Sequence, residues 1–484
     1  MSLTAALRTA SAALALNASQ AALVGRNVAN AGDVSASRKM SQVVSGVDGT
    51  GGRLVITRAA DMALAAANLA ATAQAAAATA QSDGLSRLQT VMGDPGAESS
   101  PAGLVAALGA ALQTYAAAPS DETAGAAAVA AAGRLAGGLN AATRAIQSLR
   151  TETDAAMAAS VATINDLLAR FDRSDAAVVR GLATGADVTD AQDARDVTLK
   201  ALAGEIGVST LARADGSIAI YADGGATLDD RGARTVSVKP ATALAAGVAG
   251  AAVMVDGVAV TGAGASMPIR SGALAGLARL RDETAPRLQS QLDELARGLV
   301  EAFGEQDASG NTRPGLFTWP GAPASPPNST PGLAGSIAVA AAADPDRGGS
   351  PSALRDNAIN GAGFSSNAGG AASYSARLQA LTDALDATRA FDPAAGLGGD
   401  ASVAGYASGV AGALEAARKI ASDHASAAGA LATQSAAALS NATGVNLDAQ
   451  MSHMLDLENA YQASAKLLSA ANGMMAALFA AVQA

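Results

Sequence analysis

The sequence has no cysteine, few aromatic residues and no basic segment, and each absence excludes a class of function. None of the 484 residues is cysteine, which rules out thiol catalysis, disulfide bonds and thiolate metal sites. Aromatic residues make up only 2%, and 42 acidic residues against 32 basic ones give a net charge of -10. Because no stretch concentrates Lys and Arg as a nucleic-acid surface does, we expect no nucleic-acid partner.

Long, strongly apolar runs are also missing from the sequence. No window holds 18 or more strongly apolar residues, so we expect no membrane insertion. Arg8 and the apolar residues after it faintly resemble a signal peptide, but Ser11 and Asn17 interrupt the run and no clear cleavage site follows. The start of the chain is therefore better interpreted as part of the folded protein than as a cleaved signal.

Alanine is abundant, and its properties predict how the helices pack. Hydrophobic residues make up 50% of the chain, and alanine supplies most of them. Alanine is the best helix former, but its side chain buries little area. The composition therefore predicts long, thin helical packing more than thick globular cores.

Both ends of the chain carry apolar residues at alternating steps of four and three. From the start the positions are Leu3, Leu7, Ala10, Leu14, Asn17, Ala21, Val24 and Val28. Near the end they are Leu447, Met451, Met454, Glu458, Tyr461, Ala465, Leu468, Asn472, Met475, Phe479 and Val482. This heptad spacing predicts that residues 1–35 and 445–484 pair as a coiled coil, although two ordinary amphipathic helices on a globular core fit it too. Glu458 and Asn472 either fix the register of the seam or mark a helix with neighbours on several sides.

The interior is predicted to be helical with a β-rich insertion. Residues 36–204 and 345–444 form the expected helical domain, in which 126–171 fit one long helix. Between alternating apolar segments, Asp215-Gly216 and Asp256-Gly257 are hairpin signals, and they predict an inserted β domain over 205–275. Residues 276–344 are expected to hold a return helix and a Pro-rich loop. The predicted fold is mainly α, elongated and multidomain.

The two ends also carry motifs that resemble those of bacterial flagellar rod, hook and hook-associated proteins. The stretch VNLDAQMSHMLDLENAYQASAK, from Val445, has their Val-Asn/Asp-Leu start followed by Met and Ala-Tyr-Gln-Ala, and Asn27-Val28-Ala29-Asn30 looks like their Asn-Ile/Val-Ala/Ser-Asn box. Arg38 also stands where that group has Arg, but Ser35-Ala36 replaces its usual Gly-Tyr.

Interior segments narrow the resemblance to one family of hook-associated proteins. The run Ala194-Arg195-Asp196-Val197-Thr198-Leu199, followed by Ile206-Gly207-Val208, looks like a segment of the hook-associated protein 1 (FlgK) family. Residues 272–277 and Glu301-Ala302-Phe303 resemble the same family. The likeness covers most of the chain and is weakest over residues 60–180.

The resemblance implies a structural protein of the extracellular flagellum. Members leave through the flagellar type III export channel without a cleaved signal and form a ring that joins hook to filament. Their terminal helices pair in an inner coiled-coil layer, with a helical-bundle second domain and a small outer β-rich domain further out. The implied partners are further copies of the chain, the hook protein, a second junction protein and an export chaperone.

The sequence contains no pattern of residues that indicates a catalytic, cofactor or metal site. His453 and Asp456 lie one helical turn apart, but a zinc site needs three or four ligands and the other histidine, His424, lies on a different predicted helix. We therefore predict no enzyme, no cofactor and no metal. The predicted assembly interface is instead made of residues on the two terminal seams: Leu3, Leu7, Leu14, Val24, Val28, Leu447, Met451, Met454, Glu458, Tyr461, Leu468, Met475 and Phe479.

Two other functions remain open at this point. The chain fits, less well, another flagellar axial protein such as a rod or hook subunit. It also fits an alanine-rich coiled-coil surface adhesin, which predicts a cleaved signal or an anchor.

Overall fold

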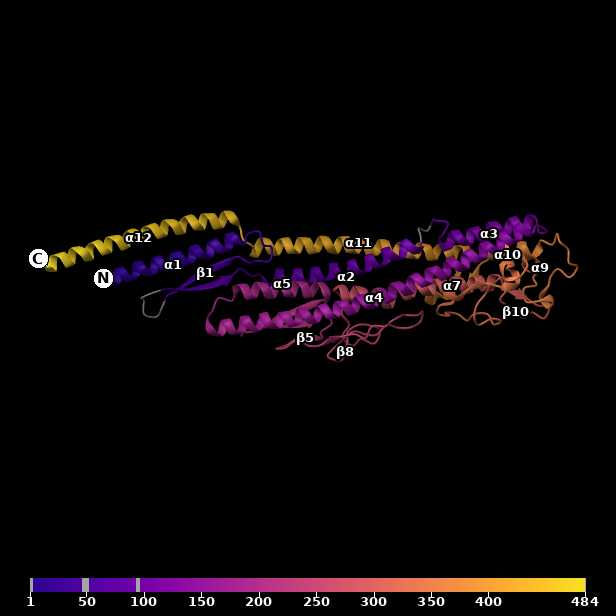
Figure 1. Cartoon of the computed structure of the whole chain (residues 1–484), viewed down its shortest axis with the longest axis horizontal. Helices are drawn as coiled ribbons and strands as arrows, with labels where there is room; N and C mark the ends of the chain where they lie inside the picture. The colour runs from indigo at the N-terminus through magenta and orange to yellow at the C-terminus, as the bar shows by residue number, and fades with distance from the viewer. Residues whose placement is uncertain (1–2, 46–51, 93–95, 484) are drawn as a thin grey trace.

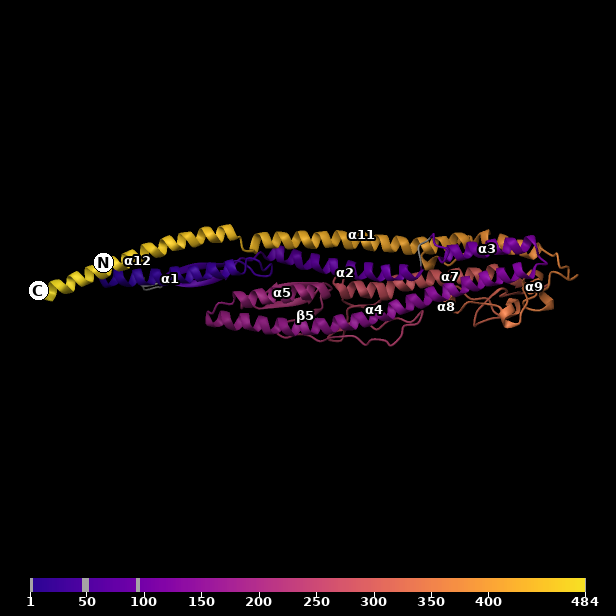
Figure 2. The same ribbon diagram turned by 45° about the horizontal axis from the view of Figure 1, so that its top comes forward.

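The protein is an elongated stack of long helices with both chain ends at one end. The computed structural model describes residues 3–45, 52–92 and 96–483. Helices α1 (Leu3–Ala29) and α12 (Leu447–Gln483) lie side by side at that end and are called the terminal pair below (Figure 1, Figure 2). The remaining helices run roughly along the same axis. Long helices with only small antiparallel sheets confirm the predicted mainly α fold and the pairing of the chain ends.

One very long helix, α4 (Glu122–Thr184), supports the body of the molecule. It begins where the carboxylate of Asp121 accepts hydrogen bonds from the backbone N–H groups of Thr123 and Ala124. It ends at Gly185, whose φ of 69° suits glycine at a helix end. Its 63 residues span about 95 Å. The predicted long helix is thus confirmed, and it extends beyond the expected range in both directions.

Two hydrophobic cores lie along α4. The first packs α3 (Pro101–Ala117), α7 (Ala285–Ala302), α10 (Ala376–Asp386) and α11 (Val403–Thr443) against the first half of α4. The second packs α5 (Thr189–Glu205), α6 (Ala273–Arg279) and several strands against its second half. Helix α2 (Met62–Met92) runs beside α11 and links the body to the terminal pair.

The predicted hairpins of the β-rich segment are both present. Strands β3 (Val208–Ala212), β4 (Ile218–Ala222) and β5 (Thr227–Asp229) form one antiparallel sheet, and β6 (Val236–Ser237), β7 (Met254–Val255) and β8 (Val258–Ala259) form another. Asp256 and Gly257 have φ values of 50° and 82°, as a tight two-residue hairpin requires. Strand residues such as Ile220 share one core with Phe171 of α4. The β-rich segment therefore shares a core with α4.

The return helix is also present, with an interruption. Helix α6 passes through a π-helical turn, η1 (Leu280–Thr284), into α7. At this turn Arg281 is fully buried and forms an ion pair with Asp154 of α4. Residues 304–344 are mostly irregular, in line with the predicted Pro-rich loop. Irregular structure continues to residue 402, broken by α10, where the helical domain was expected. The short elements of this region are β9 (Glu305–Gln306), β10 (Thr312–Arg313), β11 (Phe317–Thr318), α8 (Leu333–Ser336), β12 (Ala338–Val339), α9 (Pro351–Asp356), β13 (Arg389–Ala390) and β14 (Asp400–Ala401).

One hairpin was not expected from the sequence. Strands β1 (Lys39–Ser45) and β2 (Gly52–Arg58) pair in antiparallel register from Lys39 opposite Arg58 to Ser45 opposite Gly52. They lie against α1, in a segment that had been assigned to the helical domain. This hairpin connects the terminal pair to the body, and its first residues form part of the site described next.

Candidate assembly interface

The terminal pair is antiparallel, and two polar contacts set its alignment. The side-chain amide of Asn27 donates to Gln450 Oε1 at 2.9 Å, and that of Asn17 donates to Ser464 Oγ at 3.4 Å. Asn17 is the single polar position on the predicted N-terminal seam, and its contact with α12 confirms that this position faces the partner helix. The predicted N-cap is also present, because Asn446 Oδ1 accepts a hydrogen bond from the N–H of Ala449.

The face of α12 that contacts α1 differs from the predicted seam, mainly in one of its two columns. In the first column Met454, Leu468 and Met475 are half-buried as expected, whereas Leu447 and Tyr461 are exposed. The second column consists of Gln450, Leu457 and Ala471, which are buried, and it lies one residue before the predicted column of Met451, Glu458, Ala465 and Asn472. The two polar residues Glu458 and Asn472 are exposed beside the seam, which favours a helix with neighbours on several sides.

The other predicted interface residues divide between the two helices. On α1, Val24 is buried and Leu7, Leu14 and Val28 are half-buried, while the side chain of Leu3 lies outside the described part. On α12, much of the large apolar side-chain surface is exposed: Leu447 49%, Met451 52%, Leu455 59%, Tyr461 45%, Leu467 64%, Met474 55%, Leu478 57% and Phe479 60%. Glu458 is exposed too. Apolar surface of this extent on one helix is typical of an interaction site.

Asn27 connects α1, the hairpin and α12 at the base of the terminal pair. Its side-chain Nδ2 donates to the carbonyl of Lys39 at 2.9 Å as well as to Gln450, and its Oδ1 accepts from the N–H of Lys39 at 2.9 Å. Close by, the N–H of Arg38 donates to the carbonyl of Thr443 at the end of α11 at 2.7 Å. A buried side-chain amide with its donors and acceptor satisfied holds its neighbours in a single arrangement.

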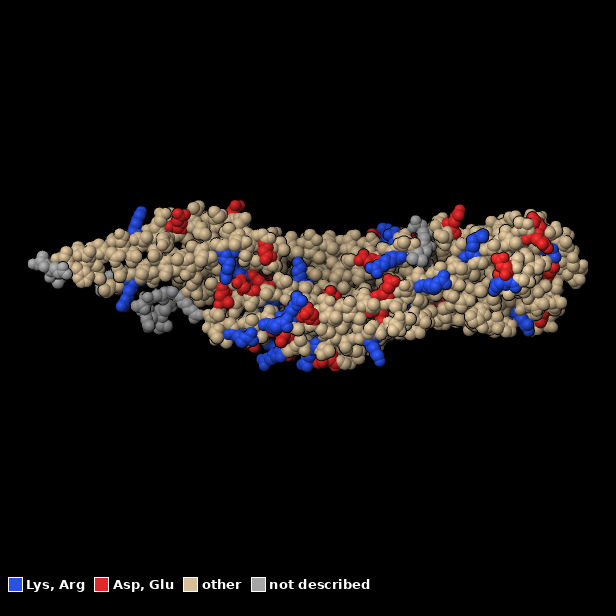
Figure 3. Space-filling model, in the orientation of Figure 1, with Lys and Arg blue, Asp and Glu red and all other residues tan. Residues whose placement is uncertain are grey.

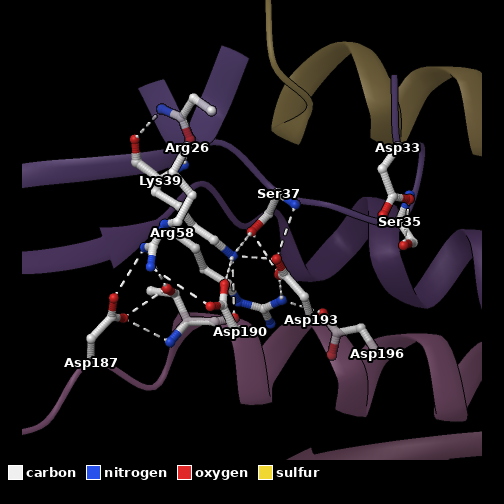
Figure 4. Close-up of polar contacts among 12 residues, drawn as sticks. Arg26, Asp33, Ser35, Ser37, Lys39, Arg58, Asp187, Asp190, Asp193 and Asp196 are labelled. Atoms are coloured by element: carbon white, nitrogen blue, oxygen red, sulfur yellow. Dashed lines mark hydrogen bonds and ion pairs between the residues drawn. The ribbon is translucent and has the colours of Figure 1, made fainter. Parts of the chain in front are cut away.

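A group of charged residues joins the hairpin and α1 to α5 (Figure 4). The ammonium of Lys39, whose side chain is 1% exposed, forms an ion pair with Asp193. Arg58 contacts Asp193 at 3.0 Å and Asp196 at 2.6 Å. Arg26 contacts Asp187 at 3.0 Å. We call this group the polar node: Arg26, Lys39, Arg58, Asp187, Asp190, Asp193 and Asp196.

The centre of the polar node is Asp193, whose carboxylate is shared by several donors. Ser37 donates to it from its hydroxyl at 2.6 Å and from its N–H at 3.2 Å. Burial alone would raise the pKa of Asp193, but the hydrogen bonds from Lys39 and Ser37 outweigh it and hold the pKa below its usual value of 3.8. The carboxylate is therefore ionised near neutral pH and neutralises a buried ammonium group.

Arg195 and Asp196, which are adjacent on α5, contact different parts of the molecule. Arg195 is buried and contacts the carboxylate of Asp175 on α4 at 2.7 Å and the carbonyl of Gly216 in the first β hairpin at 2.8 Å. Asp196 contacts Arg58 on the other side of α5. Helix α5 is thus tied both to the body and to the hairpin that leads to the terminal pair.

The turn that contains Ser35-Ala36 is held by local hydrogen bonds, although these residues stand where the resembling proteins usually have Gly-Tyr. The carboxylate of Asp33 accepts hydrogen bonds from the N–H of Ser35 at 2.8 Å and from its hydroxyl at 2.6 Å. Such a local side-chain contact stabilises a turn without glycine. These bonds also lower the pKa of Asp33 from its usual value.

Lys39, Asp193 and Gln450 make contacts that the sequence does not reveal, and Asn27 stands out there only as part of a motif. The signal for Asn27 was its place in the Asn-Val-Ala-Asn box. Lys39 and Asp193 had no signal, because 154 residues separate them and neither stands in a recognisable pattern.

The described residues show no arrangement suited to metal binding or to crossing a membrane. No group of three or more His, Asp or Glu side chains among them is placed to hold a metal ion, and His453 is exposed. None of the helices in the described part combines the length and apolar character of a membrane span.

Comparisons with known proteins identify two parts of the chain. Residues 85–317 match the family model described as the flagellar hook-associated protein FlgK helical domain, and residues 438–480 match that of the flagellar basal body rod FlgEFG protein C-terminal segment. A solved structure of the flagellar hook junction protein FlgK from Burkholderia pseudomallei is similar at 22% identity with a TM-score of 0.42. That likeness covers 52% of this chain and 46% of the other, so the chain matches less than half of that protein's length. No curated protein matches the chain.

Proposed function

We propose that the chain is a member of the FlgK family of flagellar hook-associated proteins and a structural junction protein that links the flagellar hook to the filament, because residues 85–317 match the FlgK helical-domain model. It is exported by the flagellar type III system and acts outside the cell as part of the flagellum. Its role is mechanical and not enzymatic, and it assembles through the terminal pair.

The observation that carries this proposal is the unmatched apolar surface of α12. Helix α1 covers one face of α12, while Met451, Leu467 and Met474 on the flanks stay more than half exposed. Burying one such side chain contributes about 1.5–3 kcal/mol. Neighbouring subunits that cover these flanks supply the burial that an alanine-rich pair of helices lacks.

The partners follow from a position between two structures. Copies of the chain associate in a ring through their terminal pairs. The hook protein lies on one side of the ring and a second junction protein on the other, and an export chaperone holds the chain before assembly. The match of residues 85–317 to the FlgK helical domain favours this role over that of a rod or hook subunit.

A deletion of residues 473–484 tests the role of α12. The expected result is that the shortened protein is exported but is absent from detached flagella, because it lacks much of the exposed apolar surface. Filaments that still assemble on such hooks would contradict the proposal. Electron microscopy of a strain without the protein is expected to show free hooks and shed filament protein.

Point variants separate assembly from folding. Leu467→Gln with Met474→Gln is expected to remove the protein from flagella while leaving its thermal unfolding unchanged, since both side chains are exposed. The matched control is Val197→Gln with Leu211→Gln, two exposed apolar side chains of the body (47% and 56%), which is expected to leave incorporation intact.

The remaining alternative is an alanine-rich surface adhesin. It predicts a cleaved signal or a membrane anchor. The intact mass of the exported protein decides between the two, because flagellar export leaves the N-terminus uncut and an adhesin signal does not.

A further inference from the structure

The charges of the terminal pair are separated along its length. Lys466, at the middle of α12, and Arg8, near the start of α1, lie nearer the free tip of the pair than its acidic residues do. Asp448, Asp456 and Glu458 lie towards its base, where α12 begins. All five side chains are exposed. Figure 3 shows this end of the molecule as largely uncharged, with basic side chains nearer the tip and acidic ones nearer the base.

None of these charges is neutralised within the described part of the chain. The ion pairs found there join other residues, and none involves Arg8, Lys466, Asp448, Asp456 or Glu458. The polar node and α11, in contrast, have their charges paired at close range. The terminal pair thus presents an acidic base and, nearer the tip, two basic side chains, and none of these has an ion-pair partner within the described part of the same molecule.

Exposed apolar side chains accompany these charges along the whole of α12. Leu447, Met451 and Leu455 lie at the base, Tyr461 and Leu467 lie near the middle, and Met474, Leu478 and Phe479 lie towards the tip. A second copy displaced along the axis brings the tip group of one molecule against the base group of the next. Two copies in register instead bring like charges together.

We propose that adjacent copies pack with their terminal pairs staggered, so that Arg8 and Lys466 of one copy lie against the acidic residues 448–458 of the next. This rests on the proposed function and specifies its contact between copies. Lys466 is separated from Glu458 by eight residues and from Asp448 by 18, so at 1.5 Å per residue the stagger is about 12–27 Å. The charge pairs set the offset, while the apolar flanks supply most of the affinity.

Reversal of one half tests the stagger. Arg8→Asp with Lys466→Glu makes the tip acidic, and Asp448→Lys with Asp456→Lys and Glu458→Lys makes the base basic. Either set alone places like charges opposite each other across a staggered contact. Incorporation into flagella is then expected to fall two- to fivefold per contact, the range for exposed ion pairs. Both sets in one chain restore opposite charges and are expected to restore incorporation.

The result is different for copies in register. There the wild type already places like against like, so reversing one half changes nothing. The matched control reverses the exposed pair Lys419 and Asp423 on α11, which are 3.0 Å apart, and is expected to leave incorporation at the wild-type level.

Cysteine pairs measure the offset directly, because the natural chain has no cysteine. In Lys466→Cys with Asp456→Cys, ten residues, or about 15 Å of helix, separate the two thiols within one copy. A disulfide requires Cα atoms within about 7 Å, so it can form only between copies. Oxidation of detached flagella is expected to produce covalent ladders with this pair or with Lys466→Cys and Asp448→Cys.

The outcomes separate the two proposals. Intact incorporation of every charge variant, or the absence of ladders from flagella that contain both cysteine variants, overturns the stagger and leaves the junction role standing. Absence of the wild-type protein from the hook–filament junction overturns the junction role itself. Ladders formed by Lys466→Cys alone indicate copies in register, or contact with a different partner if the ladder contains another protein, and either overturns the stagger.

Discussion

Replacing Asp193 by Asn should release the hairpin β1–β2 and the base of α1 from the body. The substitution keeps the size of the side chain and removes the charge that faces Lys39, whose side chain is 1% exposed. Breaking one partner of a buried ion pair costs about 3–5 kcal/mol. Lys39 keeps the exposed Asp190 at 3.6 Å and the carbonyl of Thr189 at 3.2 Å, so we expect the lower end, about 3 kcal/mol.

Hydrogen exchange of the intact protein measures this local effect. A loss of about 3 kcal/mol corresponds to roughly 100-fold faster exchange of the protected amides in the hairpin, with little change in α3 or α10. Asp423→Asn on α11 is the control, because its pair with Lys419 is exposed and contributes less than about 1 kcal/mol. Exchange in the hairpin that changes less than threefold in Asp193→Asn would show that the polar node does not hold the hairpin.

The dependence on pH gives a second check of the same prediction. The pKa of Asp193 is lower in the folded protein than its usual 3.8. Its contribution to stability is therefore present above about pH 4 and is lost as the pH falls through the folded pKa. Asp193→Asn should remove this part of the acid sensitivity of the hairpin, measured as protection factors from pH 3 to pH 7.

Two further predictions concern a buried carboxylate, Asp229, and two leucines of α12, Leu457 and Leu455. Burial and nearby carboxylates raise the pKa of Asp229 to about 6, so its contribution to stability is present below about pH 4 and lost as the pH rises through 6. Asp229→Asn should therefore raise the free energy of unfolding by up to about 3 kcal/mol at pH 8 and leave it unchanged at pH 4. Equal gains at both pH values would contradict the raised pKa. Leu457→Ala removes a side chain that is 6% exposed and should cost the terminal pair about 2–4 kcal/mol, seen as faster exchange in α1. Leu455→Ala, at 59% exposed, should leave that exchange unchanged and reduce only incorporation into flagella; equal exchange in both variants would show that α12 contacts α1 through a different face.

The elements that the sequence predicts well are those governed by local rules. Asp215-Gly216 and Asp256-Gly257 specify tight turns by backbone geometry alone, and Asp121 and Gly185 bound a helix whose interior is rich in alanine. Such signals need no knowledge of distant contacts. The hairpin β1–β2 shows the opposite case, because its pairing depends on packing against α1 and on the polar node.

The sequence predicts which two helices pair, but one column of its predicted seam on α12 is not the column that faces α1. Heptad spacing shows that a helix has apolar residues at regular intervals, but α12 has them on three sides. Met451 and Leu457 are equally apolar, and only the position of α1 decides that Leu457 is buried and Met451 exposed. Alanine makes the buried face of α12 harder to predict, since it fits both a buried seam and an exposed surface. The polar node could not be predicted, because its charges are common residue types brought together from distant segments.

The contact between Asn17 and Ser464 joins residues 447 positions apart, and this has a consequence for the order of folding. The entropy lost in closing a loop grows with loop length, and contacts between distant residues form slowly. The hairpins and the helices of the body depend on shorter loops, so they form first. The two chain ends therefore meet last, after the body has brought them together.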